Sequence, residues 1–329
     1  MKAIVQERYG VPERVLSLEE RDRPPVGDDD VLVRVRATSV NTPDWITVTG
    51  VPYILRLRSG LRRPRTSVRG TDVAGVVAAV GKDVTDLQPG DEVFGSLWAG
   101  ALATPGTFAE FAVAPSSQLI GKPPGLTFEE AAASVMSGLT ALSAIRDVGR
   151  VREGTRVLIN GASGGVGTFA VQIAKALGAE VTGVSSTRNL ELLRSLGADH
   201  VVDYTKEDFT SGAERYDVIL DNVMNHRPSA TARALTPTGV LIPNSIGNTG
   251  GLFAGLPRMA RAALMGRGST NVQLVTLVVN RENLEALAAL LESGEVKVVI
   301  DKVYRLNDAA DAVAHMLGHH ARGKVAVAV

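Results

Sequence analysis

The stretch Val157–Asn189, "VLINGASGGVGTFAVQIAKALGAEVTGVSSTRN", decides the fold. Its short apolar run, glycine-rich turn, amphipathic run and second apolar run predict a strand, a loop, a helix and a strand. A loop such as "GASGGVG", placed between a strand and a helix, is typical of pyrophosphate binding. Gly164 lets the backbone approach the phosphates, and Gly167 permits close packing of the helix on the strand. The alternative is a turn with only a structural role.

The end of the second predicted strand lacks the acidic residue that usually binds a ribose 2′-hydroxyl. It reads "GVSSTRN", with Ser185 at the position of that acid. A carboxylate there would repel a 2′-phosphate, whereas Ser185 and Ser186 donate hydrogen bonds and Arg188 adds charge-assisted ones. We therefore expect NADP(H) rather than NAD(H) as the cofactor. The alternative for Arg188 is an exposed side chain at a helix start.

Composition restricts the class of protein. The chain has 329 residues, 45% of them hydrophobic, and a net charge of zero, which predicts two domains and gives no overall attraction to nucleic acid or to acidic membranes. No secretory signal and no membrane-spanning run are visible, so we expect a cytoplasmic protein. Cysteine is absent, which excludes disulfides and every thiolate metal site.

The pattern of the chain changes near residue 125. Short, Val-rich runs separated by glycine, proline and aspartate predict a β-rich first part. From Leu126 an alanine-rich helix, with a capping box of Thr127 and Glu130, opens a regular alternation of strands and helices that ends with the apolar run 272–279. The final helices and strand resemble material that returns to the first domain. We predict a Rossmann-type, doubly wound parallel sheet domain at 125–280, and a catalytic domain formed by 1–124 and 281–329.

Several motifs together resemble the medium-chain dehydrogenase/reductase superfamily over nearly the whole chain. They are "GTDVAG" (70–75), "PGDEVFG" (89–95), "GTFAEFAV" (106–113), the glycine loop, "LGADHVVDY" (196–204) and "GHHARGKV" (318–325). The resemblance implies that the β-rich domain is GroES-like. The zinc alcohol dehydrogenases of that superfamily need Cys and His ligands, but the five histidines lie outside the β-rich first part and no cysteine exists. The chain is therefore most similar to the zinc-free branch, that of quinone oxidoreductases and reticulon-4-interacting-protein-like enzymes, and we expect no metal site.

The resemblance also implies site residues. "VNTPDW" (40–45) is similar to the segment that lines the nicotinamide pocket in that branch, which places Asn41 and Asp44 at the catalytic site; the alternative is that Asp44 only caps a helix. The other implied residues all contact the cofactor. They are Ser163, Gly165 and Val166 at the pyrophosphate, Ser186, Arg188 and Tyr204 at the 2′-phosphate, Asn222 at a ribose, Ser245 and Ile246 at the nicotinamide, and His320, Ala321 and Arg322 from the C-terminal segment.

We expect an NADPH-dependent oxidoreductase that reduces quinones or α,β-unsaturated carbonyls by hydride transfer without zinc. Such acceptors are already electrophilic and do not need a Lewis acid. Two alternatives stay open: an enoyl-thioester reductase, and a non-catalytic NADPH-binding interaction protein. A small quinone or enone is the expected partner, and a homodimer is left open.

Two segments are basic and partly apolar, namely 56–69 and 250–268. The functional interpretation is contact with an anionic ligand or a membrane. The structural interpretation is an exposed loop and helix whose arginine stems cover apolar surface.

Overall fold

The computed structural model describes residues 1–98, 106–245, 253, 255–266, 270–318 and 321–329. Its contacts group the chain into two compact units. Unit 1 consists of Met1–Leu139, Val278–Glu292 and Ile300–Val329, and unit 2 consists of Thr140–Leu277 and Ser293–Val299. The domain limits inferred from the sequence stay a prediction. Among the described helices, none combines the length and the apolar character needed to cross a bilayer.

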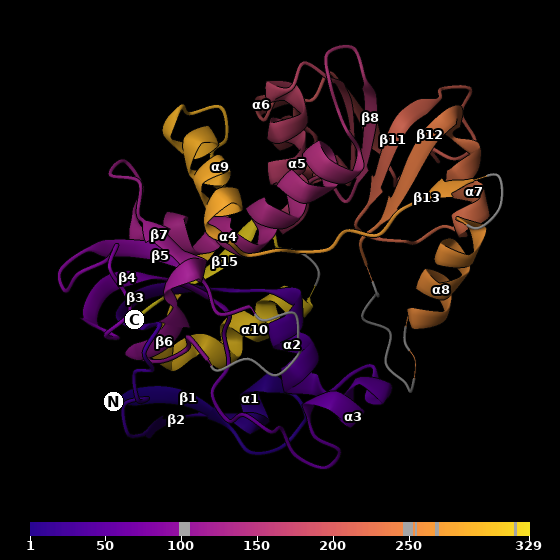
Figure 1. Ribbon diagram of the computed structural model, residues 1–329. Coiled ribbons are helices and arrows are strands. Elements are labelled where there is room, and N and C mark those ends of the chain that lie inside the picture. The colour runs from indigo at the N-terminus through magenta and orange to yellow at the C-terminus, as the bar shows by residue number, and fades with distance from the viewer. Residues whose placement is uncertain (99–105, 246–252, 254, 267–269, 319–320) are drawn as a thin grey trace. The chain divides into compact units, whose positions relative to one another are not determined.

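Unit 1 is built on a seven-stranded sheet with the order β14-β15-β3-β4-β5-β7, in which β6 also pairs with β3 (Figure 1). The strands of unit 1 are β1 (Lys2–Gln6), β2 (Leu16–Glu20), β3 (Asp30–Val40), β4 (Asp72–Val80), β5 (Glu92–Ser96), β6 (Phe111–Pro115), β7 (Leu119–Gly121), β14 (Ile300–Arg305) and β15 (Lys324–Ala328). β1 and β2 form a separate antiparallel pair. The last strand, β15, pairs antiparallel with β3, which confirms that the end of the chain returns to this sheet.

The helices of unit 1 are short, apart from α9 and from α4, whose last residues from Thr140 onward belong to unit 2. They are α1 (Pro12–Val15), α2 (Thr42–Thr49), α3 (Arg56–Ser59), α4 (Phe128–Leu142), α9 (Arg281–Glu292) and α10 (Ala309–Leu317), with 3-10 turns η1 (Tyr53–Leu55), η2 (Ser116–Gln118) and η5 (Leu306–Asp308). The predicted capping box of α4 is confirmed. Thr127 N–H donates to the Glu130 carboxylate at 2.9 Å, and Glu130 N–H donates to the Thr127 hydroxyl at 3.1 Å.

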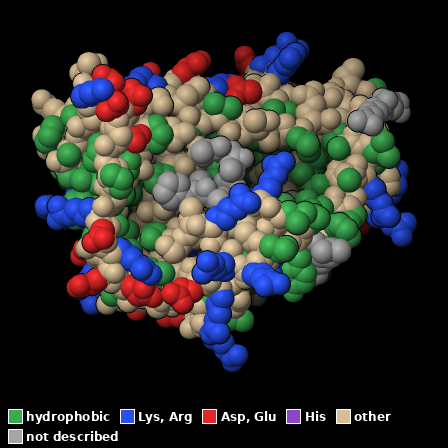
Figure 2. All heavy atoms as spheres, turned by 60° about the horizontal axis from the view of Figure 1, so that its bottom comes forward, with side chains coloured by type: hydrophobic (Ala, Val, Ile, Leu, Met, Phe, Trp, Pro, Cys, Tyr) green, Lys and Arg blue, Asp and Glu red, His purple; other side chains and the backbone are tan. Residues whose placement is uncertain are grey.

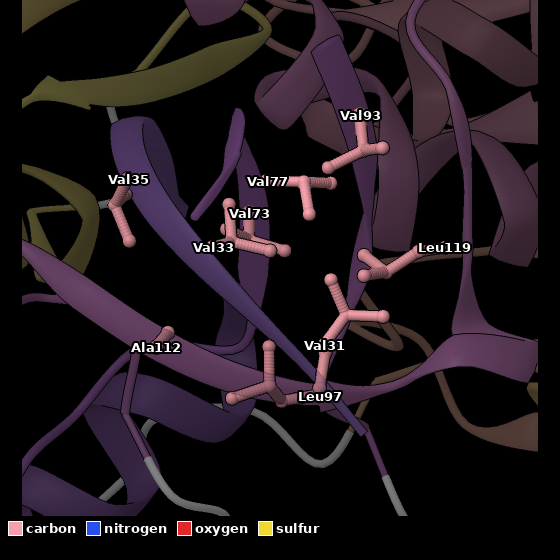
Figure 3. Packing of buried hydrophobic residues seen from close by; sticks show 10 residues of the cluster. Val31, Val33, Val35, Val73, Val77, Val93, Leu97, Ala112 and Leu119 are labelled. Carbon is pink, nitrogen blue, oxygen red and sulfur yellow. The ribbon is translucent and has the colours of Figure 1, made fainter. Parts of the chain in front are cut away.

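The core of unit 1 is made of small branched residues. Alternating valines of β3 and β4, such as Val33, Val73 and Val77, are at most 2% exposed, and Figure 3 shows these three side chains lying together. The period of two in "VLVRVRATSV" appears in the burial of β3 only at its middle, where Arg34 and Arg36 are exposed between buried residues. Toward both ends of β3 consecutive residues are buried, so both faces of the strand are covered there.

Unit 2 contains a six-stranded sheet in the order β10-β9-β8-β11-β12-β13, and every pair in it is parallel. The strands are β8 (Arg156–Asn160), β9 (Glu180–Ser185), β10 (His200–Asp203), β11 (Tyr216–Asp221), β12 (Leu235–Pro243) and β13 (Asn271–Val272). Numbered from β8, this order is 3-2-1-4-5-6, which is the doubly wound nucleotide-binding topology. The predicted Rossmann-type fold is confirmed.

The helices of unit 2 alternate with its strands. They are α5 (Gly165–Ala176), α6 (Leu190–Ser195), α7 (Pro228–Arg233) and α8 (Leu256–Met265), with a π-helical turn η3 (Ser143–Val148) and a 3-10 turn η4 (Thr187–Asn189). Figure 1 shows α5 and α6 on one side of the sheet and α7 on the other. Leu158, Ile219 and Leu241 from three adjacent strands belong to one buried cluster, which also includes Ala234 at the end of α7.

One predicted element is much shorter than expected. The apolar run 272–279 predicts a full strand, but β13 covers only Asn271–Val272. β13 lies at the edge of the sheet and pairs with β12 alone. A residue added to β13 would therefore form backbone hydrogen bonds to a neighbouring strand on one side only, whereas a residue of a central strand forms them on both sides. Leu274 and Val278 are 48% and 47% exposed, so the run is not driven into a core either.

Candidate functional site

The ends of four strands of unit 2 form one edge that carries most of the predicted cofactor residues. In the register of the sheet, Asn160 of β8 lies beside Asp221 of β11, and Asp221 lies beside Pro243 of β12. Ser185 ends β9 on the other side of β8. Because the order of strands reverses between β8 and β11, this edge is the topological switch point where such sheets bind ligands.

The glycine loop has the geometry of a phosphate cradle. Gly161 turns the chain with φ +75°, and α5 begins at Gly165 with Gly164 as its N-cap. A Cβ built on Gly164 meets only the Gly161 oxygen, at an ordinary 3.5 Å, so the space above this residue is open. A Cβ on Gly167 would lie 2.2 Å from the Gly161 oxygen, which confirms that Gly167 is needed for close packing. Ser163 and Val166 lie on the same turn, where the N–H groups at the start of α5 offer positive charge to an anion.

A cluster of hydroxyl groups closes the end of β9. The hydroxyls of Ser163 and Ser185 lie 2.7 Å apart, and the Asn189 amide nitrogen donates to Ser163 at 3.0 Å. The same nitrogen lies 3.3 Å from the Ser185 hydroxyl and 3.4 Å from the Ser186 hydroxyl. Asn189 was not among the residues predicted from the sequence, because an amide four residues past a strand end has no distinct signal. Asn189 is buried, with 5% exposure, and its hydrogen bonds link Ser163 of the glycine loop to Ser186 after the end of β9.

Two other predicted residues lie next to this cluster on the surface. Arg188 is exposed on η4, and Tyr204, 57% exposed, follows β10 and donates its N–H to the Ser185 oxygen. Asp203 ends β10 in register with Ser185, so an acidic residue does lie near this edge. Its carboxylate accepts the Thr187 and Thr205 hydroxyls, and burial leaves it 5% exposed. Asp203 is thus turned into the protein, and its position does not offer a ribose a free acceptor.

Asn222 has an unused donor. Its amide oxygen accepts the Asn244 amide at 2.8 Å, and its amide nitrogen is buried without a hydrogen-bond partner among the described residues. An orphaned buried donor at the carboxyl edge fits a ligand that brings an acceptor. The preceding Asp221 fixes the loop, because its carboxylate accepts Asn160 Nδ2 and the Met224 N–H. Ser245 follows the end of β12, and the predicted Ile246 lies outside the described residues.

In unit 1, Asn41 is the centre of a buried polar cluster. Its amide nitrogen donates to the Asp72 carboxylate at 2.8 Å, and its amide oxygen accepts the Lys324 ammonium at 2.5 Å. Ser39 donates to the same Asp72 oxygen at 2.8 Å. Both ends of the Asn41 amide are therefore occupied by the protein.

Asp44 lies one turn further on. One carboxylate oxygen accepts the Asn41 N–H at 2.7 Å, so Asp44 does close the start of α2, as the structural alternative expects. The residue is 3% exposed, and burial raises its pKa to about 7, against the lowering effect of that hydrogen bond. A carboxyl group with such a pKa exchanges a proton near neutral pH, a property that catalytic acids share.

Two carboxyl groups, of Asp44 and Asp72, and two cationic side chains, of Lys324 and Arg69, are buried in this part of unit 1. Asp72 is fully buried, and desolvation raises its pKa although Lys324 opposes this. Desolvation likewise lowers the pKa of Lys324, and it lowers that of Arg69 to about 10. The sequence analysis gave no site role to Asp72 or Lys324, although they lie in the motifs "GTDVAG" and "GHHARGKV". The available signal was a charged residue at the start of a strand whose other residues are apolar.

The remaining predictions concern the C-terminal segment and metals. Ala321 and the exposed Arg322 belong to unit 1 and precede Gly323, and His320 lies outside the described residues. Within the described parts of the chain, no group of three or more His, Cys, Asp or Glu side chains is placed to hold a metal ion.

Comparisons with known proteins agree with both units. Residues 27–124 match the alcohol dehydrogenase GroES-like domain, and residues 196–327 match the zinc-binding dehydrogenase family. The chain is 32% identical to the chloroplastic quinone-oxidoreductase QR1 of Triphysaria versicolor, over 99% of this chain and 98% of that protein. It is 33% identical to the mitochondrial NAD(P)H oxidoreductase RTN4IP1 of Mus musculus, over 100% and 89%. The Escherichia coli quinone oxidoreductase, solved as a complex with NADPH, matches with a TM-score of 0.82 at 26% identity, and each chain is covered completely.

Proposed function

Because this chain belongs to the medium-chain dehydrogenase/reductase superfamily, in the branch of the quinone oxidoreductases, we propose that it is an NADPH-dependent reductase of quinones or α,β-unsaturated carbonyls that works without zinc. The observation that carries the proposal is the glycine loop. It leaves open space at Gly164, above the N-terminus of α5, at the switch point of a parallel sheet. That space and the orphaned Asn222 donor fit a dinucleotide.

Different residues of unit 2 would bind different parts of the cofactor. Ser163, Gly165 and Val166 would hold the pyrophosphate through hydroxyl and backbone N–H groups. Ser186, Arg188 and Tyr204 would bind the 2′-phosphate, and Asn222 would donate to a ribose. Asn189 supports the phosphate end, because its amide hydrogens point at the serine oxygens and leave a hydroxyl proton free to turn outward. Acceptor-only groups such as phosphate need donors of this kind.

A bound nicotinamide would supply the hydride, and Asn41 and Asp44 of unit 1 are the residues proposed to handle charge and protons. Reduction of a carbonyl places negative charge on its oxygen, which requires a donor and then a proton. Asp44 suits the proton step, since its carboxyl has a pKa of about 7. Asn41 suits a positioning role, because Lys324 and Asp72 hold both ends of its amide and its N–H holds Asp44.

The absence of zinc is part of the proposal. Tetrahedral zinc sites in this kind of enzyme use thiolate and imidazole ligands, and the sequence has no cysteine. Quinones and enones accept hydride without a Lewis acid, so a chain that has no cysteine ligands for zinc is suited to this class of acceptor. A cytoplasmic location and a homodimer stay proposals from the sequence, and the relatives above are named as chloroplastic and mitochondrial proteins.

An acceptor screen tests the function. NADPH oxidation is followed with 9,10-phenanthrenequinone, with a simple enone and with crotonyl-CoA, and a Gly164→Val variant serves as the control that lacks the cofactor space. Turnover with the quinone or the enone supports the proposal. Turnover with crotonyl-CoA alone identifies an enoyl-thioester reductase. NADPH binding with no turnover on any acceptor identifies a non-catalytic nucleotide-binding protein.

A further inference from the structure

The segment between Asp44 and Asp72 has a charge unlike the rest of the chain. It contains six arginines and no acidic residue, whereas the whole protein has a net charge of zero. Two of these arginines serve unit 1 itself: Arg69 is buried, and Arg56 donates to the Gly50 oxygen at 2.9 Å. The other four are exposed, and in the described part of the chain none has a carboxylate within ion-pair distance: Arg58, Arg62, Arg63 and Arg65.

Large apolar side chains are exposed among these arginines. Leu57 and Leu61 are 62% and 67% exposed, and Tyr53 is 46% exposed. Tyr53 and Leu57 lie four residues apart along η1 and α3 and therefore share one face. We call the seven exposed residues the arginine–leucine surface. Figure 2, which turns the lower side of Figure 1 forward, shows Lys and Arg side chains beside hydrophobic ones on this face.

The arginine–leucine surface is held firmly on unit 1. The Tyr9 hydroxyl donates to the Gly60 oxygen at 2.6 Å and lies 3.0 Å from the Ser59 hydroxyl. Gly60 has φ +117°, a conformation that L side chains rarely adopt, and Arg65 N–H closes the turn on the Ser59 oxygen at 2.8 Å. The exposed leucines are thus presented by a fixed turn, and exposure of such residues in a fixed position indicates a contact surface.

A groove next to this turn is suited to an anion. It measures about 680 Å³, and its charged lining residues are Arg21, Arg63, Arg65 and Glu7. Arg21 is ion-paired with Glu19 at 2.8 Å, so Arg63 and Arg65 are the arginines offered to an anion. Guanidinium groups bind phosphate oxygens through paired hydrogen bonds. The groove therefore adds a place for a phosphate group beside a basic and apolar face.

We propose that the arginine–leucine surface docks on the face of an anionic lipid bilayer. Apolar side chains flanked by arginines are the composition that lies at a membrane interface, where the leucines enter the acyl boundary and the arginines meet lipid phosphates. The proposal does not depend on the reaction of the enzyme. It does place the protein where lipid-soluble acceptors dissolve, which suits the proposed substrate class.

Vesicle sedimentation tests the docking. The full-length protein is mixed with vesicles of phosphatidylcholine alone, or of phosphatidylcholine with about one third phosphatidylglycerol. We expect binding to the anionic vesicles only, and release when salt is raised to about 1 M, where screening acts within about 3 Å. Equal binding to both vesicle types, or binding to neither, overturns the proposal.

Variants locate the contact. Arg62→Gln/Arg63→Gln should weaken vesicle binding by about 30-fold, from roughly fivefold per arginine at an anionic surface. Leu57→Ser/Leu61→Ser should weaken it by about tenfold or more. The control, Arg152→Gln/Arg305→Gln, removes two exposed charges elsewhere and should leave binding unchanged.

Two results contradict this assignment. A loss of binding in the control that equals the loss in the Arg62/Arg63 variant would show that net charge alone attracts the protein. Thermal protection of wild type by inorganic phosphate, lost in Arg63→Gln but without vesicle binding, would assign the groove to a soluble anion instead. NADPH oxidation by all variants is measured in parallel, so a failure of the proposed reaction is seen separately from a failure of docking.

Discussion

Two glycines of the same loop should respond oppositely to the same substitution. In Gly164→Ala the new methyl group meets only the Gly161 oxygen at 3.5 Å, and φ −84° with ψ 180° is open to alanine. The gain of about 0.4–1 kcal/mol from a stiffer unfolded chain then offsets a weaker N-cap, so the free energy of unfolding stays within about 0.5 kcal/mol of wild type. The methyl group fills the space proposed for the pyrophosphate. Loss of one or two charge-assisted hydrogen bonds should weaken NADPH binding by about 100-fold.

Gly167→Ala should do the reverse. Its methyl group would lie 2.2 Å from the Gly161 oxygen and 2.7 Å from two backbone atoms of Ala162, none of which can rotate away. Overpacking typically costs about 1–3 kcal/mol, and contacts this short with backbone atoms put Gly167→Ala at the upper end of that range. The helix propensity of alanine returns about 1 kcal/mol, which leaves a destabilisation of roughly 2 kcal/mol.

Denaturant unfolding and isothermal titration with NADPH separate the two effects. The reasoning is refuted if Gly164→Ala binds NADPH as wild type does, because the loop would then be a structural turn only. It is also refuted if Gly167→Ala is as stable as wild type.

Further substitutions test the remaining parts of the account. Arg188→Ala should weaken NADPH binding by about 10–100-fold and leave NADH binding unchanged, since one hydrogen bond to a charged group contributes about 1.5–3 kcal/mol; equal losses for both nucleotides in titrations would assign the phosphate to another group. Ser185→Asp should shift the ratio of the two dissociation constants toward NADH, and an unchanged ratio would contradict the role given to the end of β9. Burial raises the pKa of Asp44 from 3.8 to about 7, so the stabilisation associated with the protonated carboxyl is complete below about pH 4 and is lost as the pH rises to 7. Asp44→Asn should remove about 4 kcal/mol of the pH dependence of the free energy of unfolding, measured by chemical unfolding. If wild type and Asp44→Asn show the same dependence of the free energy of unfolding on pH, Asp44 titrates normally. Lys324→Met leaves the Asp72 charge buried without its compensating cation and should lower the free energy of unfolding by about 3–5 kcal/mol at neutral pH, whereas an unchanged value would mean that Asp72 is protonated.

The sequence predicted the Rossmann-type unit well because its signals are local. The strand, glycine loop and helix of 157–176 lie within one continuous stretch. The loop pattern specifies glycine at 167, and the structure shows that a side chain there would collide with the Gly161 oxygen. The shortened β13 was missed, since an apolar run does not reveal whether a strand has one neighbour or two.

The buried cluster of unit 1 was only partly predicted. Asn41 and Asp44 came from a motif, but Lys324 contacts Asn41 across 283 positions of sequence. A single sequence gives no signal for a contact that arises when the last strand joins the sheet beside β3. For the same reason the sequence left open whether Asp44 only caps α2. The structure shows that it closes the helix and is also buried among charges.

The most direct test of the central claim is the initial rate of NADPH oxidation with 9,10-phenanthrenequinone, measured on tag-free protein after dialysis against a chelator. Zinc in the same sample is counted by elemental analysis. The account predicts quinone-dependent turnover that is faster with NADPH than with NADH, unchanged by the chelator, with far less than one zinc per chain. About one zinc per chain, together with activity that the chelator abolishes and added zinc restores, would contradict it.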